Sequence, residues 1–398
     1  MSVFEAFLAS DDALDAFDDA AVLDAMLRFE AGLAAVQAEL GVIPADAGAV
    51  IASACDLGRF DVKGLVRASG RAGSLAIPLL QHLKVAVDAQ RAGYSAWTHF
   101  GSTSQDVIDT AMVLCTQRVM APLLDDLRQV VMALLELAER WCDTPLLART
   151  LMQPASVTSF GLKALHWAAP LKESLPVLQA CMRDALRLQL GGAVGTLAQM
   201  GGRGAEVAGR LATRLGLGTG ELPWHVERAR WVRLGAELGV MVGSLGKIAL
   251  DISLMAQFEV AEAAEPVEPG RGGSSAMPHK RNPVASMIAL AAAARVPGLV
   301  GSMLSCMPQQ HERALGTWQA ELAVWPALVT AAHGSVHAMA GMLPSLVIDA
   351  DRMRANIMRL RSALPREAAD EWFDPALAAG LRTEVLDRAA LWRRSIEQ

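Results

Sequence analysis

The amino-acid sequence predicts an all-α protein, and three observations support this prediction. Hydrophobic residues make up 53% of the chain of 398 residues, yet aromatic residues make up only 5%. The apolar content is therefore mainly Ala, Leu, Val and Met, which suit closely packed helices better than sheets. Apolar residues also recur every three to four positions along much of the chain, whereas strand-like alternation is scarce.

The first amphipathic helix is predicted over residues 22–40. Its apolar positions, which include Val22, Met26, Phe29 and Leu33, are separated by polar residues. The glycine and proline that follow predict its end. A second helical region is predicted over residues 104–142, with Pro122 as a break or kink.

The third helical region is the most informative. Residues 225–265 contain no proline, and a continuous helix of that length would span about 60 Å. Its apolar residues cover more than one face, so it must be buried on all sides. We therefore expect a multi-helix bundle that is shared between subunits. At the end of this region and just beyond it, the spacing of Glu259, Glu262, Glu265 and Glu268 is typical of a solvated helix edge.

Chain length predicts two or three structural units, at about 100–200 residues per domain. We expect an N-terminal helical domain over residues 1–105, a central long-helix bundle over 106–345 and a shorter C-terminal helical segment over 346–398.

Composition excludes several functional classes. The net charge of −6 does not favour non-specific binding to nucleic acid. The acidic N-terminus lacks the basic region of a signal peptide, and Arg295 and Pro297 interrupt the longest apolar stretch, so no membrane span is expected. No CxxC motif indicates a zinc ribbon or a disulfide framework. We expect a cytoplasmic protein.

The segment richest in side chains that could bind or react with a substrate is residues 272–283, Gly-Gly-Ser-Ser-Ala-Met-Pro-His-Lys-Arg-Asn-Pro. Its glycines permit a mobile loop with unusual backbone angles. Two adjacent serines offer hydroxyl groups, and the basic residues supply positive potential that can lower a serine's pKa and bind carboxylates. A basic, solvated loop is the plainer interpretation.

Two further segments are rich in polar side chains that could bind a substrate. Residues 99–110 read His-Phe-Gly-Ser-Thr-Ser-Gln-Asp-Val-Ile-Asp-Thr, which is consistent with a helix N-cap and with an anion site at a helix N-terminus. Residues 148–161 read Ala-Arg-Thr-Leu-Met-Gln-Pro-Ala-Ser-Val-Thr-Ser-Phe-Gly.

Together these segments resemble the signature regions of the fumarase/aspartase superfamily. Residues 272–283 are similar to the pattern GSSxMPxKxNP, and residues 148–161 are similar to RTHxQxAxPxTxG. The resemblance runs from about residue 4 to about residue 361. It implies an all-α fold, a homotetramer with sites shared between subunits, a shortened C-terminal domain, and no cofactor or catalytic metal.

The branch that the sequence resembles most is that of the 3-carboxy-cis,cis-muconate cycloisomerases. Residues 189–197, 222–228 and 311–321 are similar to that branch, and Leu151 stands where the superfamily usually has a catalytic histidine. The reverse reaction of a cycloisomerase expels a carboxylate, which can depart unprotonated at neutral pH because an ordinary carboxylic acid has a pKa near 4. Loss of the histidine is therefore tolerable in a cycloisomerase and damaging in an amine lyase.

The resemblance also implies the roles of individual residues. A loop serine is the general base, with Ser274 the first choice and Ser275 the alternative, and His99 is a candidate for binding or proton transfer. A tricarboxylate substrate needs several cationic and hydrogen-bonding partners. The candidates are Thr103, Ser104, Arg149, Gln153, His225, Arg228, Lys280, Asn282 and Arg313.

Three other functions stay open at this point: an adenylosuccinate lyase-type C–N lyase, a cycloisomerase for a sulfonated muconate, and a non-catalytic helical scaffold. His333 and His337 have the i, i+4 spacing of a metal-binding pair. Because no third ligand is apparent in the sequence, we interpret this pair as a surface or packing feature.

Overall fold

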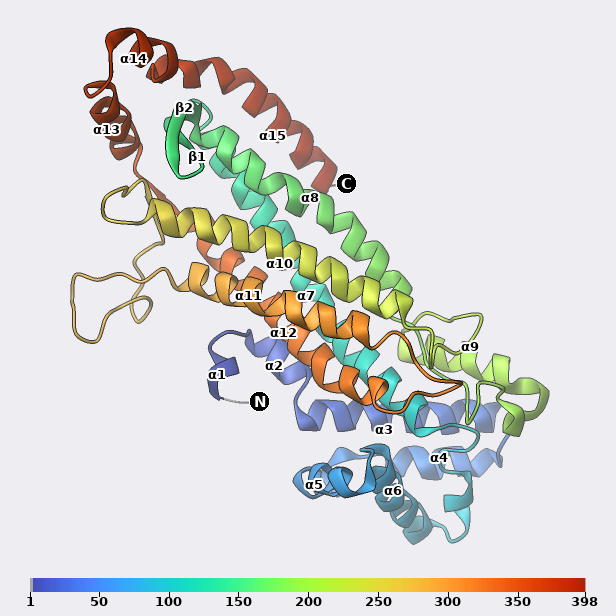
Figure 1. The fold of residues 1–398 in the computed structure, drawn as a ribbon. Coiled ribbons are helices and arrows are strands. Elements are labelled where there is room, and N and C mark those ends of the chain that lie inside the picture. The colour runs from blue at the N-terminus through green and yellow to red at the C-terminus, as the bar shows by residue number, and fades with distance from the viewer. Residues whose placement is uncertain (1–2, 398) are drawn as a thin grey trace.

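A computed structural model describes residues 3–397. The predicted all-α class is confirmed, because helices account for nearly all the regular structure of the described residues (Figure 1). The strands are short and form two antiparallel pairs. Their bounds are Pro145–Thr150 (β1) with Gln153–Ser159 (β2), and Ala263–Ala264 (β3) with Val347–Ile348 (β4).

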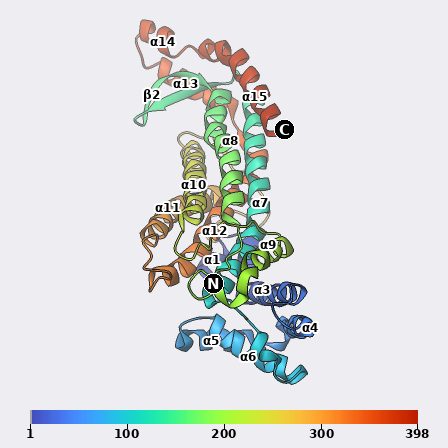
Figure 2. The same cartoon turned by 90° about the vertical axis from the view of Figure 1, so that its right-hand side faces the viewer.

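The long helices run side by side and form a central bundle, which gives the molecule its elongated shape (Figures 1 and 2). Helix α7 alone spans about 55 Å at 1.5 Å per residue. The bundle helices are Ser104–Arg140 (α7), Phe160–Ala185 (α8), Ala229–Met255 (α10), Val284–Ser305 (α11) and Thr317–Met342 (α12).

Smaller helices surround the two ends of the bundle. The N-terminal helices α3 and α9 pack near the start of α7, whereas α15 runs back along α7 and α8 (Figure 1). The bounds are Val3–Ala6 (α1), Asp11–Ala16 (α2), Asp19–Glu39 (α3), Ala45–Ala54 (α4), Val62–Ala72 (α5), Ala76–Gln90 (α6), Gly204–Leu215 (α9), Ala350–Arg361 (α13), Arg366–Trp372 (α14) and Arg382–Glu397 (α15).

The first two predicted helices are confirmed. Helix α3 begins after Asp18, whose carboxylate accepts a hydrogen bond from the Ala21 amide and caps the helix. Helix α7 is continuous, so Pro122 lies inside it and does not break it.

The third helix is shorter than predicted. Helix α10 ends at Met255, and residues 256–262 turn away from its axis. Ala261 adopts a left-handed conformation with φ of 51°, which directs the chain so that Glu262 packs inward. The Glu262 carboxylate binds Arg149 and Asn356. The interpretation of Glu262 as part of a solvated helix edge is therefore wrong, because its side chain is fully buried.

This architecture separates the segments that carry chemistry. Figure 1 shows the start of α7 at the lower right, near α6 and α9. The loop between α10 and α11 protrudes at the opposite end of the bundle, and the β1–β2 hairpin lies at the upper left. We refer to residues 272–283 of the α10–α11 loop as the serine loop.

Candidate active site

The start of α7 is organised around one buried carboxylate. Asp106 is fully buried and forms a capping box with Thr103, so the expected N-cap is confirmed. Its two oxygens also accept hydrogen bonds from the amides of Gly191 and Gly192, each at 2.9 Å. His225 Nε2 lies 2.7 Å from the same carboxylate. Asp106 therefore joins the 99–103 segment, the 191–192 turn and His225.

His99 lies immediately before this cap and pairs with a buried glutamate. Its Nδ1 is 2.6 Å from Oε1 of Glu30, a residue of α3 whose side chain has no exposed surface. Burial alone would lower the pKa of His99, but the charge and hydrogen bond of Glu30, together with the charge of Asp106, outweigh it. The net effect is a pKa of His99 above its ordinary value. Glu30 and Asp106 thus stabilise the protonated form of the His99 side chain.

We predict that Glu30→Gln lowers the pKa of His99, because the substitution removes the neighbouring charge and keeps the side-chain shape. The limb of the pH–kcat/KM profile that reports His99 should then move to lower pH. A matched control is Glu39→Gln, since Glu39 lies on the same helix and its side chain is exposed.

The same variant should change how stability depends on pH. A histidine whose pKa is raised on folding adds stability below its unfolded pKa of about 6.5, and this stability is lost as the pH rises through the folded pKa. Unfolding of the wild type across this range should show that loss, and Glu30→Gln should reduce it. Identical pH profiles for the wild type and Glu30→Gln would contradict the assigned role of Glu30.

Neighbouring side chains extend this cluster toward solvent. Arg313, from the loop before α12, is exposed and donates a hydrogen bond to the Thr103 hydroxyl. Ser104 is the first residue of α7, where free amide groups and the helix dipole favour anions. His99, Thr103, Ser104 and Arg313 thus lie together, and we call them the α7 cluster.

Two predicted substrate ligands are buried and already have carboxylate partners in this structure. Arg228 is buried, and its guanidinium is held by Asp109 at 2.9 Å and by Glu321 at 2.6 Å. His225 is also buried, and its Nε2 is taken by Asp106. Arg228 thus links α7 with α12, and His225 supports the Asp106 network, while direct binding of substrate by either residue stays a prediction.

Arg149 and Gln153 lie on the β1–β2 hairpin at the other end of the bundle. Arg149 forms a bidentate pair with Glu262, at 2.9 and 2.8 Å, and its side chain remains 31% exposed. Gln153, at the start of β2, is exposed. The hairpin is therefore tied by Arg149 to the chain that leads into the serine loop.

The hairpin turn has an unusual composition. Leu151 and Met152 have φ of 49° and 65°, a conformation that asparagine and glycine adopt far more readily. Their side chains are 97% and 71% exposed. The tip of the hairpin is therefore a strained turn that presents two large apolar side chains to solvent.

Ser274 and Ser275 lie in the serine loop, which Asn282 closes at its far end. The Asn282 amide donates to the Gly272 carbonyl at 2.8 Å. Gly272 has φ of 69°, and a Cβ atom there would lie 2.5 Å from the Asn282 oxygen, so glycine is required. Ser274 Oγ accepts a hydrogen bond from the Met277 amide at 3.1 Å, whereas Ser275 is exposed. An amide donor to Ser274 Oγ favours its ionised form.

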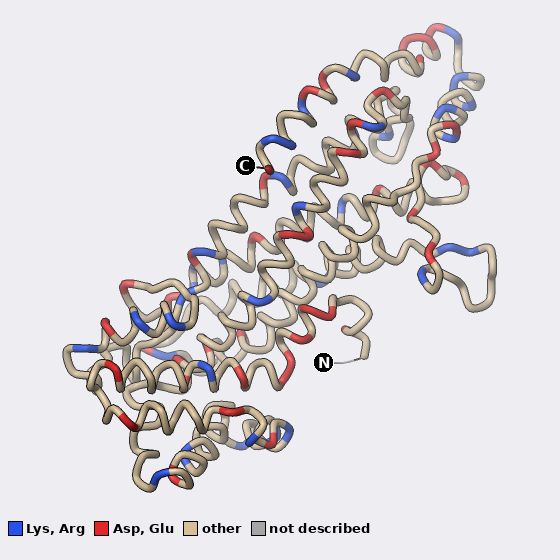
Figure 3. The backbone as a smooth tube through the Cα atoms, turned by 180° about the vertical axis from the view of Figure 1, so that it is seen from behind, with Lys and Arg blue, Asp and Glu red and all other residues tan. Residues whose placement is uncertain are grey.

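Lys280 gives the serine loop positive charge. Its side chain is exposed, as are its neighbours His279 and Arg281. Figure 3 shows basic segments on the loop that protrudes from the bundle. The loop therefore carries a serine pair, an amide side chain and positive charge within a segment rich in glycine and proline.

A single chain does not assemble these parts into one site. The serine loop follows the C-terminal end of α10, whereas His225 and the α7 cluster lie near its N-terminal end (Figure 1). Helix α10 has 27 residues and is about 40 Å long. Within one chain, the α7 cluster and the serine loop therefore lie at opposite ends of the bundle (Figure 1).

Three supporting residues were missed by sequence reasoning: Glu30, Asp106 and Glu262. Only Asp106 carried a local signal, since it lies three residues after Thr103 at a helix start. Glu30 and Glu262 act on partners 69 and 113 residues away, so no local pattern could reveal them.

The fold and these segments define a helical lyase. A family model described as a lyase matches residues 8–298, and the chain belongs to that family. A curated 3-carboxy-cis,cis-muconate cycloisomerase from Pseudomonas aeruginosa is 42% identical over 355 residues, which cover 89% of this chain and 77% of the relative. The predicted resemblance to the fumarase/aspartase superfamily, and to its cycloisomerase branch, is confirmed.

Two further comparisons describe the range of these relatives. The crystal structure of a 3-carboxy-cis,cis-muconate lactonizing enzyme from Pseudomonas putida superposes with a TM-score of 0.90 at 32% identity, and all of both chains is covered. A nitrosuccinate lyase from Streptomyces davaonensis is 37% identical over 383 residues, covering 94% of this chain and 81% of the relative.

Proposed function

We propose that this protein is a cycloisomerase that converts 3-carboxy-cis,cis-muconate to its γ-lactone in the catabolism of aromatic compounds through protocatechuate. The observation that carries this proposal is the 42% identity to a muconate cycloisomerase over most of the chain, together with the TM-score of 0.90 to a muconate lactonizing enzyme. Leu151 at the hairpin tip supports it, because departure of a carboxylate in the reverse reaction needs no acid at that position.

The reaction is an intramolecular addition followed by proton transfer. One substrate carboxylate adds to a double bond, and the carbanion that forms is stabilised by the neighbouring carboxylate. That carbon then takes a proton from the serine loop, with Ser274 the first choice and Ser275 the alternative. The serine is then reprotonated from solvent, so the reaction takes up one proton, and we propose that the enzyme uses no cofactor.

The remaining charges position a trianionic substrate. We propose that the α7 cluster supplies His99, Thr103, Ser104 and Arg313, with His99 as a binding or proton-transfer group. We propose that the hairpin supplies Arg149 and Gln153, and that the serine loop supplies Lys280 and Asn282. Because the whole protein carries a net charge of −6, attraction of the substrate depends on these local donors.

We propose a homotetramer with sites shared between subunits. Three helices are long and apolar enough, by length and composition alone, to cross a membrane: Ser104–Arg140, Ala229–Met255 and Val284–Ser305. Their most apolar windows are 78%, 50% and 28% buried within the chain. We propose that the exposed apolar surface of α10 and α11 packs against other copies of this chain in a cytoplasmic assembly, since the separated site segments also require other copies.

Within this assembly the chain would keep the predicted organisation. Residues 106–345 would form the shared bundle, and residues 1–105 and 346–398 would flank its two ends. Limited proteolysis that first cuts near these boundaries would support the division.

The test is turnover by the purified protein of four substrates: 3-carboxy-cis,cis-muconate, its sulfonated analogue, adenylosuccinate and nitrosuccinate. Ultraviolet absorbance follows consumption, and chromatography identifies the product. We expect lactone from carboxymuconate at the highest kcat/KM. Turnover of adenylosuccinate or nitrosuccinate alone would overturn the proposal. A higher kcat/KM on the sulfonated muconate would identify that compound as the preferred substrate.

A further inference from the structure

The histidine pair on α12 has a third partner that its sequence spacing could not reveal. His333 and His337 both face Asp126, which lies on α7. Asp126 Oδ2 is 3.3 Å from His333 Nε2 and 2.9 Å from His337 Nδ1. The three ligand atoms all lie within 4.8 Å of one another. This cluster is separate from the α7 cluster, the hairpin and the serine loop.

We propose that Asp126, His333 and His337 form a binding site for a divalent transition-metal ion of the zinc class, which links α7 to α12. Two imidazoles and one carboxylate are a common three-ligand set for such ions, with a further position left for water. Magnesium and calcium prefer oxygen ligands, so this set selects against them.

The spacing of the ligand atoms fits the size of such an ion. With metal–ligand bonds of about 2.0–2.2 Å, neighbouring ligand atoms in a tetrahedral site lie roughly 3.3–3.5 Å apart. The contact between Asp126 and His333 already has this separation, and the contact between Asp126 and His337 needs to open by only a few tenths of an ångström.

His333 is arranged as a metal ligand with a supporting partner. Its ring is fully buried, and Nδ1 lies 2.7 Å from the hydroxyl of Ser10. We assign the proton to Nδ1, so that it donates to Ser10 and leaves the Nε2 lone pair facing Asp126. Nε2 makes no hydrogen bond among the described residues. With the proton on Nδ1, the Nε2 lone pair is free to bind an ion that the Asp126 carboxylate, 3.3 Å away, also contacts.

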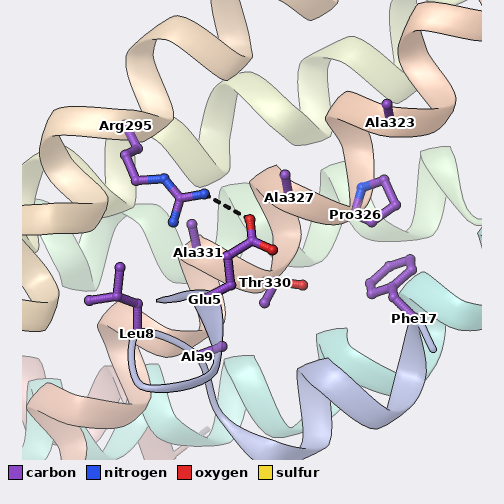
Figure 4. A pocket seen from close by; sticks show the side chains of 10 residues that line it. All are labelled: Glu5, Leu8, Ala9, Phe17, Arg295, Ala323, Pro326, Ala327, Thr330 and Ala331. Atoms are coloured by element: carbon purple, nitrogen blue, oxygen red, sulfur yellow. Dashed lines mark hydrogen bonds and ion pairs between the residues drawn. The ribbon is translucent and has the colours of Figure 1, made fainter. Parts of the chain in front are cut away.

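The N-terminal segment holds Ser10 against this position. A Cβ atom added at Gly334 would lie 2.2 Å from the Leu8 carbonyl oxygen, so the segment packs directly on α12 beside His333. Figure 4 shows the neighbouring cavity of about 180 Å³, where Glu5 pairs with Arg295 of α11 at 3.2 Å. The segment therefore excludes water from His333 on one side.

The opposite side of the cluster is open to solvent. The His337 side chain is 58% exposed, and that of Asp126 is 14% exposed. An ion can therefore reach the Asp126 carboxylate past the exposed His337 side chain.

The test measures metal binding by the intact protein after treatment with a chelator. Co²⁺ is titrated as a spectroscopic probe for tetrahedral coordination, Zn²⁺ is used in competition, and Mg²⁺ is the oxygen-preferring control. We expect one ion per chain, with Zn²⁺ displacing Co²⁺ and raising the Tm. Mg²⁺ should do neither.

Variants assign the binding to these side chains. His337→Gln is the main variant, because an exposed side chain can be replaced with little risk to folding; it should weaken Co²⁺ binding at least about tenfold. Asp126→Asn should do the same, and Ser10→Ala should weaken binding about 10–100-fold. His82→Gln is the matched control, because His82 is an exposed histidine on α6; it should bind as the wild type does.

The result does not depend on the enzyme's substrate, because every readout is binding or melting temperature. Absence of a tetrahedral Co²⁺ spectrum would overturn the proposal. Binding that His337→Gln leaves unchanged would also overturn it, since the ion would then lie elsewhere.

Discussion

Replacing Ser274 and Ser275 together by alanine is expected to lower kcat by about 10²–10⁴-fold, the usual contribution of a general acid or base. The substitution removes both hydroxyl groups that could exchange the proton on the substrate carbon. It should leave the assembly intact, because the serine loop protrudes from the bundle and contributes little to its core (Figure 1). The measurements are steady-state kinetics on 3-carboxy-cis,cis-muconate and size-exclusion chromatography with light scattering.

The single variants distinguish the two serines. Because Ser274 Oγ accepts an amide hydrogen bond that favours its ionised form, Ser274→Ala should account for most of the loss. Ser395→Ala, an exposed serine on α15, is the matched control and should retain wild-type kcat. A double variant with wild-type kcat would support a non-catalytic scaffold. A loss confined to Ser275→Ala would transfer the role to Ser275.

Mixing two inactive variants is expected to restore activity. One parent carries Ser274→Ala with Ser275→Ala in the serine loop, and the other carries His99→Gln with Thr103→Ala in the α7 cluster. If these segments come from different subunits, random assembly after co-expression leaves about one quarter of the sites with both segments intact. The mixture should therefore recover about one quarter of wild-type activity, from parents that each have almost none.

The matched control mixes two variants whose defects lie in the same segment. Ser274→Ala with Ser275→Ala is combined with Lys280→Ala, and few restored sites are expected beyond those of the less damaged parent, because each serine loop is one continuous segment. If the cross-segment mixture also shows no recovery while mixed oligomers are demonstrated by affinity tags, the shared-site proposal fails. Separate measurement of substrate turnover by the wild type keeps that outcome distinct from failure of the proposed reaction.

The parts of the fold that were predictable from the sequence depend on local patterns. Helices α3 and α7 follow from apolar periodicity and from caps a few residues away. The end of α10 was not predictable in this way. The chain leaves the helix after Met255, and Glu262 then binds an arginine that lies 113 residues earlier in the sequence.

The candidate site shows the same division. Sequence motifs identified the serine loop and the segment that begins α7, because the residue types lie together in sequence. They could not show that the charge of Arg228 is neutralised by Asp109 and Glu321 on two other helices. Residue type indicates what a side chain can bind, but only the packed structure shows whether a carboxylate already occupies it.

The Asp106 network has an evolutionary consequence. One carboxylate holds the segment before α7, the 191–192 turn and His225, so a substitution there disturbs all three at once. Few amino-acid substitutions are therefore expected to be tolerated at this end of the molecule. The hairpin has its own anchor in the Arg149–Glu262 pair, but the side chains at its tip, Leu151 and Met152, are exposed and can be substituted one at a time. New substrate preferences within this lineage are therefore expected to arise from the hairpin tip and the loop, while the Asp106 end is expected to change little.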